Sequence, residues 1–153
     1  MVTTMKRTRK SGITLLEVLF AMVLVLACAL IVAATMPIAD VARGKADLLN
    51  KAGGLAQKQL EAIRGVGYAN MNPTALAGYG YIDSTTQIAS NTYSFSNSDN
   101  ANLDNPALIL PSGAGTVKVE QWQVNLIRLT ITVTYNDNQR NRSVTVGTLV
   151  ANL

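Results

Sequence analysis

The sequence of 153 residues contains no histidine and a single cysteine, Cys28. The lack of histidine excludes His-dependent acid–base chemistry and His-containing metal sites, and a lone cysteine excludes a disulfide within the chain. Charged residues are also scarce at 14%, whereas 48% of the residues are hydrophobic and the mean hydropathy is +0.21. A chain of this length and composition is about one domain in size, too apolar for disorder, and too weakly charged for an ordinary soluble surface.

The net charge of +4 comes entirely from the N-terminus, where four basic residues precede Gly12 without an acidic one: Lys6, Arg7, Arg9 and Lys10. The rest of the chain has nine basic and nine acidic residues and is neutral. It therefore offers little electrostatic basis for a nucleic-acid partner. We interpret Arg140 and Arg142 as part of a solvated turn rather than as a contact to DNA or to an acidic surface, because no aromatic residue lies in that turn.

A long apolar run follows the basic residues. Residues 13–36 read ITLLEVLFAMVLVLACALIVAATM, with Glu17 as the only charged residue. As a helix, the run would extend about 36 Å, enough to cross a bilayer core of about 30 Å. The preceding positive charges orient the N-terminus toward the cytoplasm. A cleaved signal peptide is the alternative, but its apolar region is normally only about 7–15 residues long.

Glu17 is the anomaly in this segment. A carboxylate at the bilayer centre costs on the order of 2–3 kcal/mol on insertion scales, and less near the interface. One interpretation places Glu17 at headgroup depth, where water solvates it. The other gives it a positively charged partner from another chain, and we favour this second interpretation.

The stretch Lys10-Ser11-Gly12-Ile13-Thr14-Leu15-Leu16-Glu17-Val18-Leu19 resembles the processing motif of type IV prepilins and type II secretion pseudopilins. The resemblance implies a leader of residues 1–12, cleavage after Gly12 by a prepilin peptidase, and N-methylation of the new N-terminal Ile13. Glu17 then matches the glutamate found at the fifth position of mature chains in this family. One departure is Ile13, where the family most often has phenylalanine.

The resemblance also implies a role and a location. The methylated amine of Ile13 stays cationic and can pair with Glu17 of a neighbouring subunit that is offset by about 5–6 Å, one helical turn. The expected function is a structural filament subunit, most simply a minor pilin, with a pseudopilin of a type II secretion system as the alternative. Expected partners are the prepilin peptidase/N-methyltransferase, other pilin subunits, an inner-membrane assembly platform, and the lipid bilayer before assembly. The precursor would be a single-pass protein of the bacterial inner membrane and the product a periplasmic or cell-surface filament.

Residues 37–65 are expected to form an amphipathic stalk helix. Its apolar positions fall close to one stripe, which consists of Val41, Leu48, Ala52, Leu55, Leu60 and Ile63. Pro37 should kink or locally melt the helix. The pair at 53–54, Gly-Gly, is interpreted either as a hinge or, preferably, as a point of close packing against a sheet.

The C-terminal half predicts strands. Residues 66–115 are rich in loop-forming residues, with short strands expected around Tyr79–Ile82 and Thr92–Phe95. Residues 116–153 are expected to form an antiparallel sheet, because Leu129, Ile131 and Val133 alternate with threonines. Its last hairpin is expected to have a long loop over 136–142. The predicted fold class is α+β, with a long N-terminal helix packed on a small antiparallel sheet, as the pilin resemblance also implies.

Two further function classes are weighed against the filament subunit. The first is a single-span protein that holds a β-rich binding module outside the membrane and retains residues 1–12. The second is an enzyme, which the sequence disfavours because no nucleophile and base can be nominated without histidine. The scattered aspartates lack the spacing of a calcium loop, and no cofactor is expected.

Overall fold

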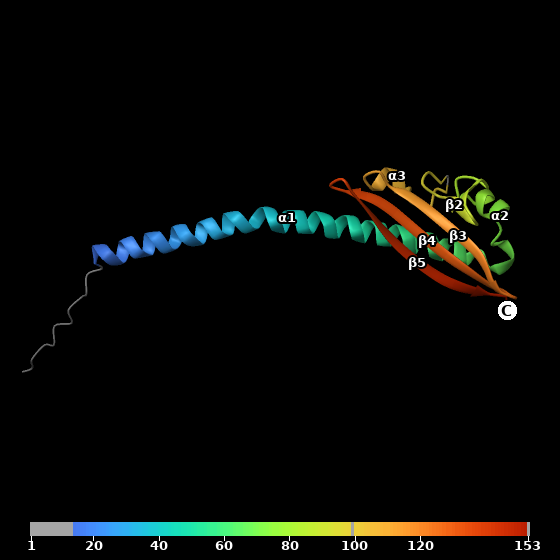
Figure 1. The fold of residues 1–153 in the computed structure, drawn as a ribbon, viewed down its shortest axis with the longest axis horizontal. Helices are drawn as coiled ribbons and strands as arrows, with labels where there is room; N and C mark the ends of the chain where they lie inside the picture. The colour runs from blue at the N-terminus through green and yellow to red at the C-terminus, as the bar shows by residue number, and fades with distance from the viewer. Residues whose placement is uncertain (1–13, 99, 153) are drawn as a thin grey trace, which may run out of the picture. The chain divides into compact units, whose positions relative to one another are not determined.

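The computed structural model describes residues 14–98 and 100–152. Gly12 and Ile13, the predicted cleavage and methylation sites, lie outside these ranges. The chain divides into two compact units, one that ends at Ala42 and one that begins at Arg43. The helix α1, Leu15–Gly65, contributes residues to both units, and five strands belong to the second (Figure 1).

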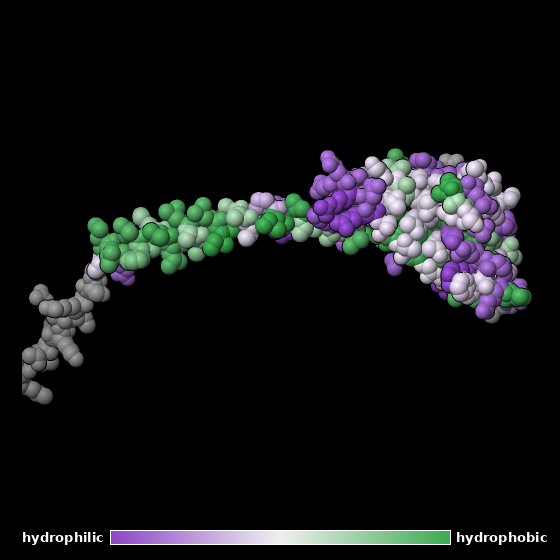
Figure 2. Space-filling model, in the orientation of Figure 1, coloured by the Kyte–Doolittle hydropathy of each residue, from purple (hydrophilic) through white to green (hydrophobic). Residues whose placement is uncertain are grey.

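In the first unit, α1 is apolar and exposed. Its large hydrophobic side chains from Leu15 to Val41 are between 44% and 85% exposed, and they cover the face that Figure 2 shows. By its length and composition, the helix is long and apolar enough to cross a membrane. It runs through Pro37 without interruption, so the predicted local melting at this proline is wrong. Proline removes one backbone donor, and the turns on either side keep the helix intact.

In the second unit, α1 buries one stripe of side chains. Ala52, Leu55, Ala56, Gln59 and Ile63 are buried, whereas the charged residues between them stay in solvent. This confirms the predicted amphipathic stripe from Leu48 to Ile63 but not at Val41, which is 51% exposed. The preferred interpretation of the glycine pair is wrong, however, because a Cβ atom built on Gly53 or Gly54 would meet no atom within 4 Å.

The sheet is a simple meander in which every neighbouring pair is antiparallel, in the order β1-β2-β3-β4-β5. The strands are β1 Gln87–Ala89, β2 Thr92–Ser94, β3 Ala114–Gln123, β4 Leu126–Asp137 and β5 Arg140–Ala151. Every second residue of β4 is buried, from Ile127 to Tyr135, and joins the stalk residues of α1 in one hydrophobic core. The predicted α+β class and the antiparallel sheet are therefore confirmed.

The region between α1 and β3 differs from the prediction. The expected strand at Tyr79–Ile82 is absent, since these residues form turns and bends after the helix α2, Pro73–Gly78. Asn72 caps α2 by accepting a hydrogen bond from the N–H of Ala75 at 2.9 Å. The region also contains a short 3-10 helix, η1, at Tyr68–Asn70, and the helix α3, at Pro106–Ile109.

The last hairpin is tighter than predicted. Instead of a loop over 136–142, β4 and β5 pair up to Asp137 and Arg140, and only Asn138 and Gln139 form the turn. Both turn residues have positive φ, 48° and 67°, as a two-residue type I′ turn requires. The polar residues 136–137 and 140–142 thus extend the strands. Because the turn takes up only two residues, the backbone N–H and C=O groups on either side of it can pair with each other across the hairpin.

Candidate functional site

The N-terminal end of α1 carries the candidate site. Glu17 lies in the first turn of the helix. Its backbone N–H donates to the carbonyl oxygen of Thr14 at 3.0 Å and to Thr14 Oγ1 at 3.3 Å. Thr14 therefore caps the helix and fixes where it begins, which places Glu17 in the first turn.

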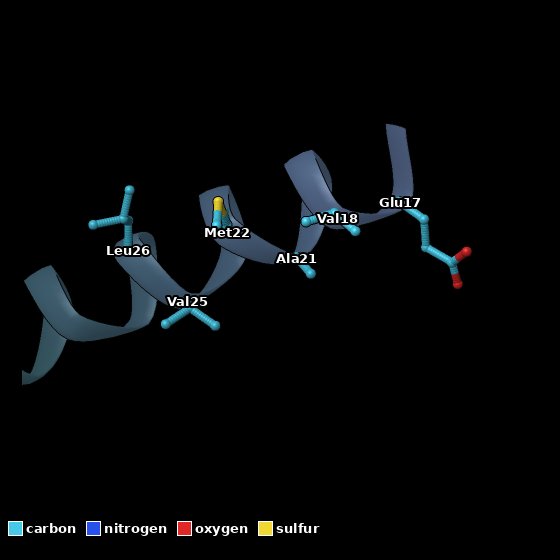
Figure 3. A pocket seen from close by; sticks show the side chains of 6 residues that line it. All are labelled: Glu17, Val18, Ala21, Met22, Val25 and Leu26. Atoms are coloured by element: carbon cyan, nitrogen blue, oxygen red, sulfur yellow. The ribbon is translucent and has the colours of Figure 1, made fainter. Parts of the chain in front are cut away.

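The Glu17 carboxylate extends away from the helix axis (Figure 3). Within residues 14–98 and 100–152 it has no hydrogen-bond donor and no basic side chain within ion-pair distance. Its neighbours along the helix are apolar and line a shallow groove with it: Val18, Ala21, Met22, Val25 and Leu26. One acidic group thus stands at the end of an apolar helix surface.

Two local effects on the ionised Glu17 oppose each other. Its position in the first turn places it near the positive end of the helix dipole, which contributes about 0.3–1 kcal/mol. Transfer of a carboxylate to the centre of a bilayer costs on the order of 2–3 kcal/mol. At the bilayer centre the dipole would be the smaller effect, and a positively charged partner could offset the remaining cost. Near the interface, where the transfer cost is lower, the two effects would be closer in size.

The apolar surface around Glu17 needs a covering. Its large side chains point to every side of the helix rather than to one stripe, so the described residues leave them exposed all round. A helix that is apolar on all sides is stable when lipid or other helices surround it. Cys28 lies within this surface and is exposed among apolar neighbours.

The other polar groups that the sequence brings to attention do not assemble into a reactive site. In the part of the chain that the structure describes, no three acidic or cysteine side chains lie close enough to hold a metal ion. Arg140 and Arg142 lie exposed at the start of β5. The only predicted site residue that the structure places is Glu17, since Gly12 and Ile13 are outside the described residues.

Sequence reasoning missed several residues that organise the second unit. Gln59 is buried and donates from Nε2 to the carbonyl oxygen of Tyr81. Asp83 accepts hydrogen bonds from the backbone N–H groups of Ser96 and Asn97, both at 3.0 Å. These contacts join segments far apart in sequence and leave no local pattern.

The cap at Thr14, in the first unit, does leave a pattern in the sequence. A threonine followed three residues later by a glutamate is a typical helix-start motif.

Arg128 and Trp122 form a further contact that only the sheet brings together. The guanidinium carbon of Arg128 lies 3.4 Å from the centroid of the Trp122 ring, a cation–π geometry. Trp122 nevertheless stays half exposed.

Comparison of the chain with protein-family models, curated proteins and solved structures finds no match to any of them.

Proposed function

We propose that this protein is a structural subunit of a type IV pilus-like filament, most simply a minor pilin. The observation that carries the proposal is Glu17, an acidic side chain without a partner in the described residues, at the start of an exposed apolar helix. Its sequence context, with Gly12 five residues earlier and a basic segment before that, resembles the prepilin processing motif.

The proposed assembly would cover the exposed apolar surface of α1 and neutralise the charge of Glu17 at the same time. Packing of the apolar parts of α1 from many subunits would cover the surface from Leu15 to Val41. At about 25 cal/mol per Å² of buried apolar surface, such a helix bundle is strongly favoured in water, and within a membrane the same helices exchange lipid contacts for each other. The free amine of Ile13, exposed by cleavage after Gly12, would then neutralise Glu17 of a neighbouring subunit and set the axial offset between subunits.

The proposal includes a route to the filament. The precursor would reside in the bacterial inner membrane with its N-terminus in the cytoplasm and the second unit on the opposite side. A prepilin peptidase/N-methyltransferase would cleave after Gly12 and methylate Ile13, and an inner-membrane assembly platform would transfer the subunit into a periplasmic or cell-surface filament. A pseudopilin of a type II secretion system would use the same residues in the same way.

A second candidate is a membrane-anchored binding module. It is favoured by the second unit, which has its own core and sheet and needs the N-terminal part of α1 only as an anchor. This candidate assigns no role to the charge of Glu17 and keeps residues 1–12 on the chain.

The two candidates differ in the effect of Glu17→Ala. For a filament subunit, the variant should be cleaved and inserted in the membrane like the parent, while its recovery in sheared filaments should fall at least about tenfold, the equivalent of 1.4 kcal/mol. The matched control is Glu61→Ala, which removes an exposed acidic residue from the same helix. Equal recovery of the Glu17→Ala variant, the Glu61→Ala variant and the parent would refute the filament role.

A further inference from the structure

The strand β5 forms a long open edge of the sheet. It pairs with β4 on one side, from Arg140 to Ala151, without a register shift. It is the last strand in the sheet order, so its other side has no strand partner in the described part of the chain. The opposite edge is different, because β1 has only three residues.

The direction of the backbone groups along β5 follows from the pairing at its two ends. The two-residue turn at Asn138 and Gln139 makes Asp137 and Arg140 a hydrogen-bonded pair. In the same register, the N–H of Asn152 donates to the carbonyl oxygen of Asn125 at 2.9 Å. Even-numbered residues of β5 therefore bond to β4, and odd-numbered ones direct N–H and C=O to the open side. These outward residues are Asn141, Ser143, Thr145, Gly147, Leu149 and Ala151.

The edge lacks the features that usually prevent strand addition. From Ser143 to Ala151 it contains no charged residue, no proline and no bulge, although proteins commonly use each of these to protect an exposed edge. Among the described residues, no donor or acceptor contacts the outward backbone groups of this stretch. A second extended chain can therefore form a regular ladder here.

A hollow beside this edge provides room for the side chains of such a chain. It measures about 630 Å³ and lies between α1 and β5, with Gly54, Lys58 and Leu60 on the helix and Val146 and Gly147 on the strand. The absence of a side chain at Gly54 helps to open it, since a Cβ built there would meet no atom within 4 Å. The inward side chains of an added strand would enter this space.

Positive charge at one end of the β5 edge favours one orientation of an added strand. Arg140 and Arg142 are exposed, and neither forms an ion pair with a described residue. In the strand that β5 already pairs with, Asp137 is the residue opposite Arg140, and apolar residues alternate with threonines from Leu129 to Tyr135. An antiparallel partner with an acidic residue near its C-terminal end would match the edge in the same way.

We propose that the β5 edge and the adjoining hollow bind an extended segment of another protein by strand addition. The segment alternates apolar with small polar residues and has an acidic residue that faces Arg140 and Arg142. Main-chain hydrogen bonds would supply affinity, while the hollow and the two arginines would supply selectivity. This role goes beyond filament formation and depends on neither cleavage after Gly12 nor the charge of Glu17.

The test uses the full chain in detergent micelles and a fluorescein-labelled peptide that copies residues 127–137, IRLTITVTYND. We expect saturable binding by fluorescence anisotropy. A peptide of the same composition with scrambled alternation should bind at least tenfold more weakly. Hydrogen exchange should slow at the outward amides of Ser143, Thr145 and Gly147, whereas exchange of the amides that already bond to β4 stays unchanged.

Two pairs of variants locate the binding. Thr145→Pro removes an outward N–H and no ladder bond, and Thr145→Val keeps that N–H. Gly54→Leu fills the hollow from the helix side, and Gly54→Ala adds only one methyl group. The proline and leucine variants should each bind at least tenfold more weakly than their controls. Gly54→Leu does not alter the strand, so it decides the outcome if Thr145→Pro fails to fold.

Three results would overturn the proposal. The first is no saturable binding of the peptide, and the second is binding that neither Thr145→Pro nor Gly54→Leu weakens. The third is protection of the outward amides without peptide in a dimer that forms with increasing protein concentration, because a second copy of this chain would then be the occupant. None of these results bears on the Glu17→Ala filament experiment, so the two proposals are tested independently.

Discussion

The Gln59 side chain in α1 donates a hydrogen bond from Nε2 to the backbone carbonyl oxygen of Tyr81, at a distance of 2.5 Å. Gln59 is only 2% exposed and lies on the helix stripe otherwise formed by apolar residues. The Tyr81 carbonyl lies outside the strands, and Gln59 provides it with a hydrogen-bond donor. The bond links the stalk part of α1 to the segment that leads toward the first strands.

Replacement of Gln59 by leucine should lower the free energy of unfolding by about 0.5–1.5 kcal/mol, because the carbonyl of the half-buried Tyr81 would lose its donor. Urea unfolding of the full chain in detergent, followed by the fluorescence of Trp122, measures this difference. Gln57→Leu is the matched control, since Gln57 is exposed on the same helix. Equal midpoints for the two variants would show that the hydrogen bond contributes no stability.

Gly115 lies directly against the ring of Phe95. A Cβ at Gly115 would be 2.4 Å from Phe95 Cζ, and Phe95 is fully buried. Gly115→Ala should therefore force the ring to shift and should cost about 1–3 kcal/mol by overpacking. Thermal unfolding measures the loss, with Gly78→Ala as control because a Cβ there meets no atom within 4 Å. An unchanged transition for Gly115→Ala would contradict the packing described for this pair.

Gly12→Leu tests the proposed cleavage site directly. The resemblance implies that the peptidase accepts a small residue before the cut, so a bulky side chain should block processing. Immunoblots of membranes from a host with a prepilin peptidase should show the precursor alone for Gly12→Leu. Ser11→Ala, a small change one residue earlier, should give the same mature product as the parent. A mature-sized band for Gly12→Leu would place the cleavage elsewhere.

The features that the sequence predicted correctly depend on short, regular patterns. The alternation of Leu129, Ile131 and Val133 with threonines determines which face of β4 is buried, and the stripe through Ala52 and Ile63 does the same for α1. In both cases the hydrophobic period alone selects the element and its buried face.

The features that it predicted wrongly are ones that hydrophobic periodicity does not reveal. Tyr79 and Tyr81 favour a strand by propensity, yet Gly80 between them takes a positive φ of 71° and makes a turn at the end of α2. The start of α2 at Asn72-Pro73 had a recognisable capping signal, but a helix of six residues is too short for periodicity to reveal it. The open edge of β5 and the hollow at Gly54 arise only once the sheet is assembled.

The candidate site shows the same division. The anomaly of Glu17 is visible in the sequence because one acidic residue interrupts an apolar run. The structure adds the cap by Thr14 and the exposure of the apolar surface on all sides. The pairing between Glu17 and an amine of a second subunit involves residues of two chains, so the sequence of one chain suggests it without determining it.

The most direct test of the filament proposal is the mass of the N-terminal peptide of the protein, isolated from membranes of a host with a prepilin peptidase. The proposal predicts a chain that begins at Ile13 and carries one additional methyl group on its amine. A chain that retains residues 1–12 and begins at Met1 would contradict it and would favour the membrane-anchored binding module.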